Sequence, residues 1–198
     1  MGIKDNFSNP KGRIGRLMVR TMNIGHSPMS IWTLRQIDWP QKADILDIGC
    51  GGGANIRRML KLCPKGRVLG IDLSEESVAQ SRIVNKKELG KRCKIYQGNV
   101  EALPFKDQCL DIVTAFETIY FWPDLEENFK EIHRVLKPNG RFIISCDSGD
   151  PNKHWEDRIP NMRSYSPEQL EQYLIDAGFS EIEIYQKINM ICVCGYVK

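Results

Sequence analysis

The sequence lacks several features that mark whole classes of protein. It has no run of about 18 apolar residues, so we expect no membrane span. Its first residues lack the apolar stretch of a signal peptide. It has no C-x-x-C pair, and its seven cysteines are an odd number, several of them in strand-like runs. We therefore expect free, buried thiols and a cytoplasmic protein.

A strong charge of one sign is also missing. The net charge of +3 and the pI of about 8.4 are too mild to indicate a nucleic-acid partner. Cys192 and Cys194 would point to the same side of a strand and could hold a soft metal, but filling space is the simpler interpretation, and we expect no metal site. The chain has 198 residues, 41% hydrophobic and 27% charged, which suits one globular domain with a substantial core.

The most informative stretch lies between residues 44 and 60. An apolar run at 45–48 predicts a short buried strand, four glycines then fall within five positions, and helical spacing begins after Ala54. Glycine lets a backbone turn sharply and approach a ligand closely. The free N–H groups at a helix start suit an anionic group. The stretch therefore predicts the start of an α/β nucleotide-binding unit.

Two families use such a turn. Gly49, Gly51 and Ala54 fit the dinucleotide pattern G-x-G-x-x-G/A, and Asp72 follows roughly 20 residues later. Residues 46–53, Leu-Asp-Ile-Gly-Cys-Gly-Gly-Gly, closely resemble motif I of the class I S-adenosylmethionine (SAM)-dependent methyltransferases. Asp47 favours the second family, because a carboxylate repels a pyrophosphate but attracts the ammonium and sulfonium of SAM.

Two further stretches resemble the methyltransferase type 11 (UbiE-like) group of this family. Residues 134–144 match the pattern R-x-L-K-P-G-G followed by a hydrophobic run, with Asn139 at the first glycine. Residues 99–105 resemble the stretch that contacts adenine, with Asn99 in place of the usual Asp. A neutral amide accepts a hydrogen bond less strongly than a carboxylate, so this departure weakens the expected adenine contact.

The resemblance covers residues 43–198. It implies an α/β, Rossmann-like class I methyltransferase fold: a seven-stranded, mostly parallel sheet with an antiparallel last strand and helices on both faces. We divide the chain into an N-terminal helical lid segment, 1–40, and a SAM-binding methyltransferase domain, 41–198. Strands are expected at 45–48, 67–72, 94–98, 109–117, 142–145, 180–185 and 190–196. Helices are expected at 11–22, 29–37, from 54 onward, 75–89, 124–136 and 167–177. Ser74 and Ser166 are expected to cap two of them, Gly178 to end the last one, and residues 138–140 to form a turn.

The resemblance also implies SAM as the cofactor. In this family the glycine turn holds the methionine part of SAM, and the acidic residue before it orients the amino end. The acidic residue after the second strand binds the ribose hydroxyls. By this resemblance the cofactor-binding residues are Asp47, Gly49, Cys50, Gly51, Asp72, Leu73, Asn99, Val100, Glu101 and Phe116.

The acceptor is expected near residues 117–122, where the fourth strand ends. Glu117 is the first candidate for a general base or for electrostatic support of the sulfonium, followed by His26 and Tyr120. Aromatic faces attract cations, although some of the aromatic residues at 120–122 must pack in the core. The substrate-pocket candidates are Asn23, Trp122 and Trp155.

We therefore predict methyl transfer from SAM to a small-molecule acceptor, whose identity the sequence leaves open. Two alternatives stay open: a non-catalytic SAM-binding regulatory or partner subunit, and a nicotinamide-dependent oxidoreductase. The basic, amphipathic pattern at 11–22 suits either a lid or a partner contact. The oligomeric state is undetermined, with a homodimer as one alternative.

Overall fold

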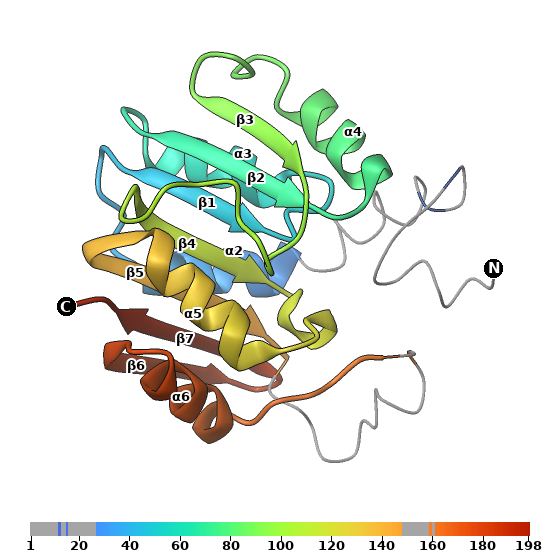
Figure 1. Cartoon of the computed structure of the whole chain (residues 1–198). Coiled ribbons are helices and arrows are strands. Elements are labelled where there is room, and N and C mark those ends of the chain that lie inside the picture. Colours follow the sequence, from blue (N-terminus) through green and yellow to red (C-terminus); the bar gives the residue numbers. More distant parts are fainter. Residues whose placement is uncertain (1–11, 13–14, 16–26, 148–158, 160) are drawn as a thin grey trace. The chain divides into compact units, whose positions relative to one another are not determined.

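The computed structural model describes residues 12, 15, 27–147, 159 and 161–198 (Figure 1). The helix expected at 11–22 thus lies almost wholly outside the described residues. The strands are β1 (Asp44–Ile48), β2 (Arg67–Asp72), β3 (Cys93–Gln97), β4 (Leu110–Phe116), β5 (Leu136–Cys146), β6 (Ser180–Lys187) and β7 (Met190–Tyr196). The helices are α2 (Ser27–Gln36), α3 (Ala54–Leu62), α4 (Glu75–Val84), α5 (Leu125–Val135) and α6 (Pro167–Asp176), with a short 3₁₀ helix, η2 (Ile119–Phe121).

The seven strands form a sheet with the order β3-β2-β1-β4-β5-β7-β6. The pairs β1–β2, β2–β3 and β4–β5 are parallel, whereas β7 runs antiparallel to both β5 and β6. This is the expected fold class, including the antiparallel last strand. The chain divides into two compact units, residues 1–99 and 100–198.

In the first unit, α3 and α4 both pack on β2, and α4 also packs on β3. Helix α3 is amphipathic as expected, since Ile56, Met59 and Leu60 are buried. Side chains attach α2 to α3. Arg58 Nη2 donates to Ser27 Oγ at 2.7 Å, and Asn55 Nδ2 donates to Ser30 Oγ at 3.1 Å. The C-terminal part of the expected lid segment is therefore anchored to the helix that follows the glycine turn.

Helix α4 is shorter than expected. Ser74 caps its start by accepting from the Ser77 N–H at 3.3 Å, as predicted, but the helix ends at Val84 and not near residue 89. The Asn85 side chain donates to the carbonyls of Gly53 and Ser81, both at 3.0 Å. This bond to a residue 32 positions earlier fixes Asn85 at the helix end.

In the second unit, α5 packs on β5, and α6 packs on β6, β7 and α5, so both helices cover one face of these strands (Figure 1). An aromatic cluster forms the core beneath them. Phe129 on α5 meets Phe142 on β5 edge-on at 5.1 Å between ring centroids. Ser166 caps α6 with a capping box, and Gly178 follows the helix with a φ of 94°, as the sequence indicated.

Strand β5 begins earlier than expected, at Leu136 and not at Phe142. Leu110 pairs with Leu136 and Ile112 pairs with Arg141, so the predicted turn at 138–140 forms a bulge inside the strand. The Asn139 N–H donates to the Val197 carbonyl at 2.9 Å. The turn residues therefore keep backbone partners and the strand is not interrupted.

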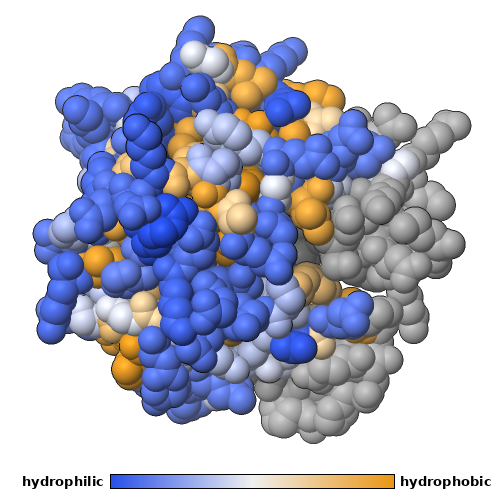
Figure 2. Space-filling model, in the orientation of Figure 1, coloured by the Kyte–Doolittle hydropathy of each residue, from blue (hydrophilic) through white to orange (hydrophobic). Residues whose placement is uncertain are grey.

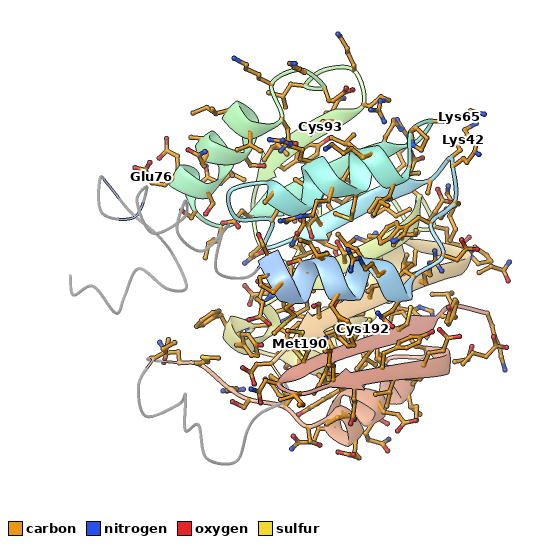
Figure 3. The ribbon with its side chains drawn as sticks, turned by 180° about the vertical axis from the view of Figure 1, so that it is seen from behind. Lys42, Lys65, Glu76, Cys93, Met190 and Cys192 are labelled. Carbon is orange, nitrogen blue, oxygen red and sulfur yellow. The ribbon has the colours of Figure 1, made fainter. Side chains whose placement is uncertain are left out.

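The cysteines behave as expected. All seven are free, and all except the half-buried Cys109 are buried. Figure 3 places Cys93 on β3 and Cys192 on β7. Burial raises the pKa of the Cys93 thiol to about 11 and also raises that of Cys192, so both stay neutral and fill space.

The described surface is mainly polar in the view of Figure 2, where apolar patches are small and separated. None of the described helices is long and apolar enough to cross a membrane. The most exposed large apolar side chain is Ile188, 86% exposed, in the turn between β6 and β7.

Candidate functional site: a glycine turn with an acidic clamp, and a buried carboxylate cluster

The glycine turn joins β1 to α3. Gly49, Gly51 and Gly53 all have a positive φ, at 65°, 51° and 77°, which L-residues with side chains rarely adopt. The Cys50 N–H donates to the Ile71 carbonyl at 3.1 Å, and the Gly53 N–H donates to the Cys50 carbonyl at 3.0 Å. The turn is thus fixed to the end of β2, and a Cβ at Gly51 would meet only open space. A ligand can approach the backbone there.

Asp72, at the end of β2, clamps this turn. Its Oδ2 accepts from the Gly51 N–H at 2.8 Å, and its Oδ1 accepts from the Ser74 N–H at 2.9 Å. Burial raises the pKa of this carboxyl, while the bonds from Ser74 and Gly51 oppose that rise. The two carboxylate oxygens have four lone-pair sites in all. The bonds from Gly51 and Ser74 and a side-chain bond with Ser77 use three of them, so one can still accept from a ligand hydroxyl.

The turn has an acidic environment. Asp47 is 2% exposed on β1, and both Asp47 and Asp72 act on the Cys50 thiol, whose pKa is raised mainly by burial and then by these two charges. Two carboxylates beside one glycine turn favour a ligand with positive charge over a pyrophosphate. The residues therefore fit SAM, with its ammonium and sulfonium, better than a dinucleotide.

One supporting contact of this turn has no signal in the local sequence. The Gly53 carbonyl accepts from Asn85, and a Cβ at Gly53 would collide with the side chains of Ser81 and Asn85. Helix α4 therefore packs directly against the glycine. Only the fold brings these residues together, because they lie about 30 positions apart in the chain.

The other predicted cofactor residues differ in exposure. Leu73 is 52% exposed just after β2, and Asn99 is half-buried after β3. In the second unit, Val100 is buried, Glu101 is exposed and Phe116 is buried at the end of β4. Their roles in binding stay predictions.

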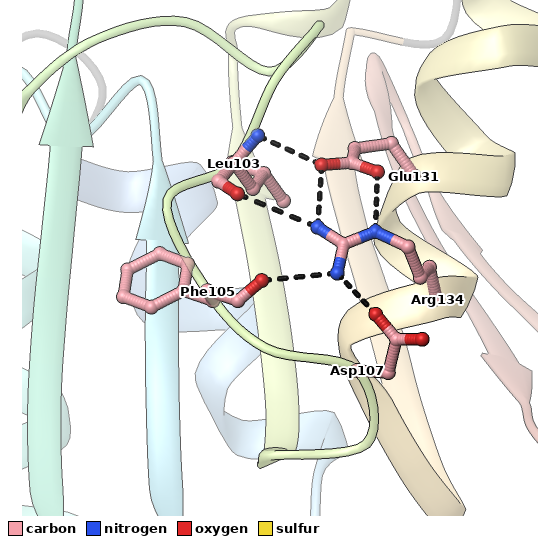
Figure 4. A network of polar contacts seen from close by, with 5 residues as sticks. All are labelled: Leu103, Phe105, Asp107, Glu131 and Arg134. Carbon is pink, nitrogen blue, oxygen red and sulfur yellow. Dashed lines mark hydrogen bonds and ion pairs between the residues drawn. The ribbon is translucent and has the colours of Figure 1, made fainter.

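A polar network holds the segment that follows Val100 and Glu101 (Figure 4). Glu131 Oε1 accepts from the Leu103 N–H at 2.8 Å and also binds the Arg134 guanidinium, at 2.7 Å. Arg134 in turn donates to the Phe105 carbonyl at 2.9 Å and to Asp107 at 2.6 Å. Side chains of α5 thus supply the backbone partners that this irregular segment lacks.

Replacing Arg134 with Ala should lower the free energy of unfolding by about 2 kcal/mol, because it leaves backbone carbonyls and Glu131 without their charged donor. The matched control is Lys130→Ala on the same helix, which removes only exposed ion pairs with Glu126 and Glu127 and should leave the free energy of unfolding nearly unchanged. Urea unfolding measures both. Equal losses in the two variants would show that the network contributes nothing specific.

The second polar cluster lies where β4 and β5 end. The Tyr120 hydroxyl donates to Glu117 Oε1 at 2.9 Å and accepts from the Asp147 N–H. Glu117 has a positive φ of 56°, and its N–H donates to the Ser145 carbonyl at 2.8 Å. A non-glycine residue held in this conformation at a strand end is typical of functional sites. The structure thus brings two of the three predicted catalytic residues together.

Burial raises the pKa of Glu117 to about 7, although the bond from Tyr120 opposes the rise. Below the ordinary value of 4.5 the carboxyl is protonated in both the folded and unfolded states. Above pH 7 the folded state holds a poorly solvated charge, so stability falls between these values. Glu117→Gln, which keeps an acceptor for Tyr120, should therefore be more stable than the wild type by about 2 kcal/mol at pH 8 and about equal to it at pH 4.5.

Urea unfolding at the two pH values tests this prediction, with the exposed Glu127→Gln as the control. If the unfolding free energies of Glu117→Gln and the wild type differ by the same amount at both pH values, Glu117 does not carry a poorly solvated charge in the folded protein.

Of the remaining predicted catalytic and substrate-pocket residues, the structure describes Trp122. Trp122 is 6% exposed and stacks on Phe142 at 6.5 Å, and it also meets Phe129 edge-on, so it packs in the core. Phe121 is half-buried, with its ring edge-on to Tyr120 at 6.2 Å. His26, Asn23 and Trp155 lie outside the described residues.

Comparisons with known proteins agree with this geometry. Residues 46–144, half of the chain, match the family model described as "Methyltransferase domain". The methyltransferase YrhH of Bacillus subtilis is 29% identical over 157 residues, which cover 79% of each chain. The 24-methylenesterol C-methyltransferase 2 of Arabidopsis thaliana is 36% identical over 155 residues, which cover 71% of this chain but only 42% of that protein.

The fold is also found among solved structures. A chain of the complex between the Haloferax volcanii Trm112 methyltransferase activator and a methyltransferase superposes with a TM-score of 0.81 at 20% identity. The match covers 91% of this chain and 93% of that one. At this identity the similarity shows a common fold.

Proposed function

Because the chain belongs to the class I SAM-dependent methyltransferases, we propose that it methylates a small-molecule acceptor and releases S-adenosylhomocysteine. SAM is the cofactor of this family, and it supplies a methyl group activated by a positively charged sulfur. The proposal depends most on one observation: Asp72 binds the glycine turn through Gly51 while keeping a lone pair available for a ligand.

The first unit provides most of the residues that we assign to the cofactor, and Val100, Glu101 and Phe116 come from the second unit. Asp47 attracts its amino end, and Gly49, Cys50 and Gly51 supply a backbone that a ligand can approach. Asp72 accepts from the ribose hydroxyls, next to the exposed Leu73. Asn99, Val100 and Glu101 are assigned to adenine, and Phe116 to the wall near the sulfonium.

The second unit provides the residues that we assign to the acceptor. Glu117 is oriented by Tyr120, whose own hydroxyl is fixed by the Asp147 N–H. A carboxylate held in this way can bind an acceptor group or take its proton. Positioning of the acceptor against SAM supplies the rest of the lowering of the activation barrier, since effective-molarity effects are worth up to about 7–11 kcal/mol.

A small-molecule acceptor has support from the relatives, because one of them is named for the sterol that it methylates. The second candidate function is a non-catalytic SAM-binding regulatory or partner subunit, and a structural neighbour comes from a complex with an activator. The nicotinamide alternative has no support, because β7 is antiparallel and the family match is to methyltransferases.

Incubation of the full chain with methyl-labelled SAM and a broad set of small metabolites tests the proposal. We expect a labelled low-molecular-weight product and an equal amount of S-adenosylhomocysteine. If SAM binds but no metabolite is labelled and no S-adenosylhomocysteine forms, the chain is a non-catalytic SAM-binding subunit and the proposal is wrong.

A further inference from the structure

Among the described residues of its unit, the buried Glu117 differs from Glu131 and Asp111 in pairing with no cation. Glu131 pairs with Arg134 at 2.7 Å, and Asp111 pairs with Lys137 at 2.8 Å. Within residues 100–147, 159 and 161–198, the groups that act on Glu117 are Tyr120 and Asp147, and no Lys, Arg or His is among them. A poorly solvated carboxylate that meets no cation of the described residues is costly, and a cationic ligand would offset that cost.

The location of this carboxylate points to a ligand. Glu117 follows β4 directly, and the cluster lies where the parallel strands β4 and β5 end (Figure 1). Ligands of open α/β sheets bind outside the carboxyl ends of the strands. The left-handed backbone of Glu117, fixed by its N–H bond to Ser145, holds the side chain at this edge. The half-buried Phe121 adds an aromatic ring on the adjacent turn.

Charge decides which acceptors suit such a site. A thiolate, phenolate or carboxylate acceptor is an anion and would be repelled by the Glu117 carboxylate. A neutral alcohol gains nothing from it beyond a hydrogen bond. An amine enters as an ammonium ion, which pairs with the carboxylate, and its nitrogen carries positive charge again once it is methylated.

We propose that the acceptor is an amine, bound as an ammonium ion by Glu117 next to Tyr120 and Phe121 at the end of β4. This inference rests on the proposed function and names the substrate class of that same site. The carboxylate takes one proton from the ammonium and leaves a neutral amine. The nitrogen lone pair then forms the new C–N bond to the methyl carbon, while the C–S bond breaks and its electron pair returns to sulfur. The products are a methylated ammonium ion, S-adenosylhomocysteine and a proton on Glu117, which passes to solvent.

The test uses the full chain with S-adenosylhomocysteine bound. Calorimetry compares phenylalkylamines of increasing length with the alcohol, thiol and carboxylic acid of the same length. We expect an amine to bind at least about tenfold more tightly than its counterparts, and Glu117→Gln to remove this preference. Glu127→Gln, an exposed carboxylate on α5, should leave it unchanged.

The pH dependence of amine binding is a second readout. Binding should weaken as the pH falls below about 7, because Glu117 then takes a proton. In the part of the chain that the structure describes, the other ionisable groups facing Glu117 are Tyr120 on η2, Cys146 at the end of β5 and Asp147 just after it. Burial raises the pKa of both Tyr120 and Cys146, so these two stay neutral in this range.

The product gives the third readout. With methyl-labelled SAM we expect the label as an N-methyl group. Transfer to oxygen, sulfur or carbon would overturn the inference and leave the proposed function intact. An amine that binds no better than its counterparts, or that binds Glu117→Gln equally well, would also overturn it. Failure to bind SAM at all would instead contradict the proposed function.

Discussion

Replacing Asp72 with Ala should weaken SAM binding by about 1.5–3 kcal/mol, or roughly ten- to a hundredfold in Kd. The substitution removes the acceptor that we assign to the ribose hydroxyls. It also frees the Gly51 and Ser74 N–H groups, which Asp72 accepts from at 2.8 and 2.9 Å. The glycine turn then loses its clamp, so the free energy of unfolding should also fall, by about 1–2 kcal/mol.

Two further variants separate the roles of Asp72. Asp72→Asn keeps one acceptor oxygen, but its amide NH₂ cannot accept from the second of the two backbone N–H groups. We therefore expect an affinity for SAM between those of the wild type and Asp72→Ala. Ser77→Ala removes the hydroxyl that hydrogen-bonds the Asp72 carboxyl and leaves the carboxylate in place. It should therefore change the affinity for SAM little. Calorimetry with SAM measures all three. An unchanged affinity in a folded Asp72→Ala protein would remove Asp72 from the site.

Gly53→Ala should cost about 3 kcal/mol of unfolding free energy or more. Its φ of 77° strains any L-residue, and a Cβ would collide with Ser81 and Asn85 on α4. The matched control is Gly51→Ala. Gly51 also has a positive φ, 51°, but a Cβ there meets open space, so the cost should be the strain alone, about 1 kcal/mol.

Urea unfolding without any ligand compares the two glycine variants, because Gly51 is also assigned to the cofactor. A larger loss at Gly53 would show that helix α4 packs directly on the turn. A difference smaller than about 0.5 kcal/mol would contradict that packing.

Much of the first unit could be predicted because its signals are local. The apolar run at 45–48, the glycines after it and the helical spacing of Ile56, Met59 and Leu60 each act within a few residues. The same holds for the caps at Ser74 and Ser166, whose side chains bond N–H groups three residues later. Backbone conformation and capping need no knowledge of the fold.

The contacts that the sequence did not indicate are the distant ones. Asn85 ends α4 early because it bonds Gly53, and Arg134 reaches Phe105 across 29 positions. Arg134 begins the R-x-L-K-P motif, but the motif does not indicate which backbone carbonyls its side chain reaches. Likewise, Glu117 was a candidate by its place at a strand end, but its bond network with Tyr120 and Asp147 needs β5 to end beside β4.

The most direct test of the account is a calorimetric titration of the full chain with SAM, S-adenosylhomocysteine and NADH. The account predicts that SAM and S-adenosylhomocysteine bind one site in the micromolar range, that Asp72→Ala weakens both, and that NADH gives no heat of binding. A folded protein that binds NADH, or that binds neither SAM nor S-adenosylhomocysteine, would contradict the assignment of the glycine turn and its acidic clamp to SAM.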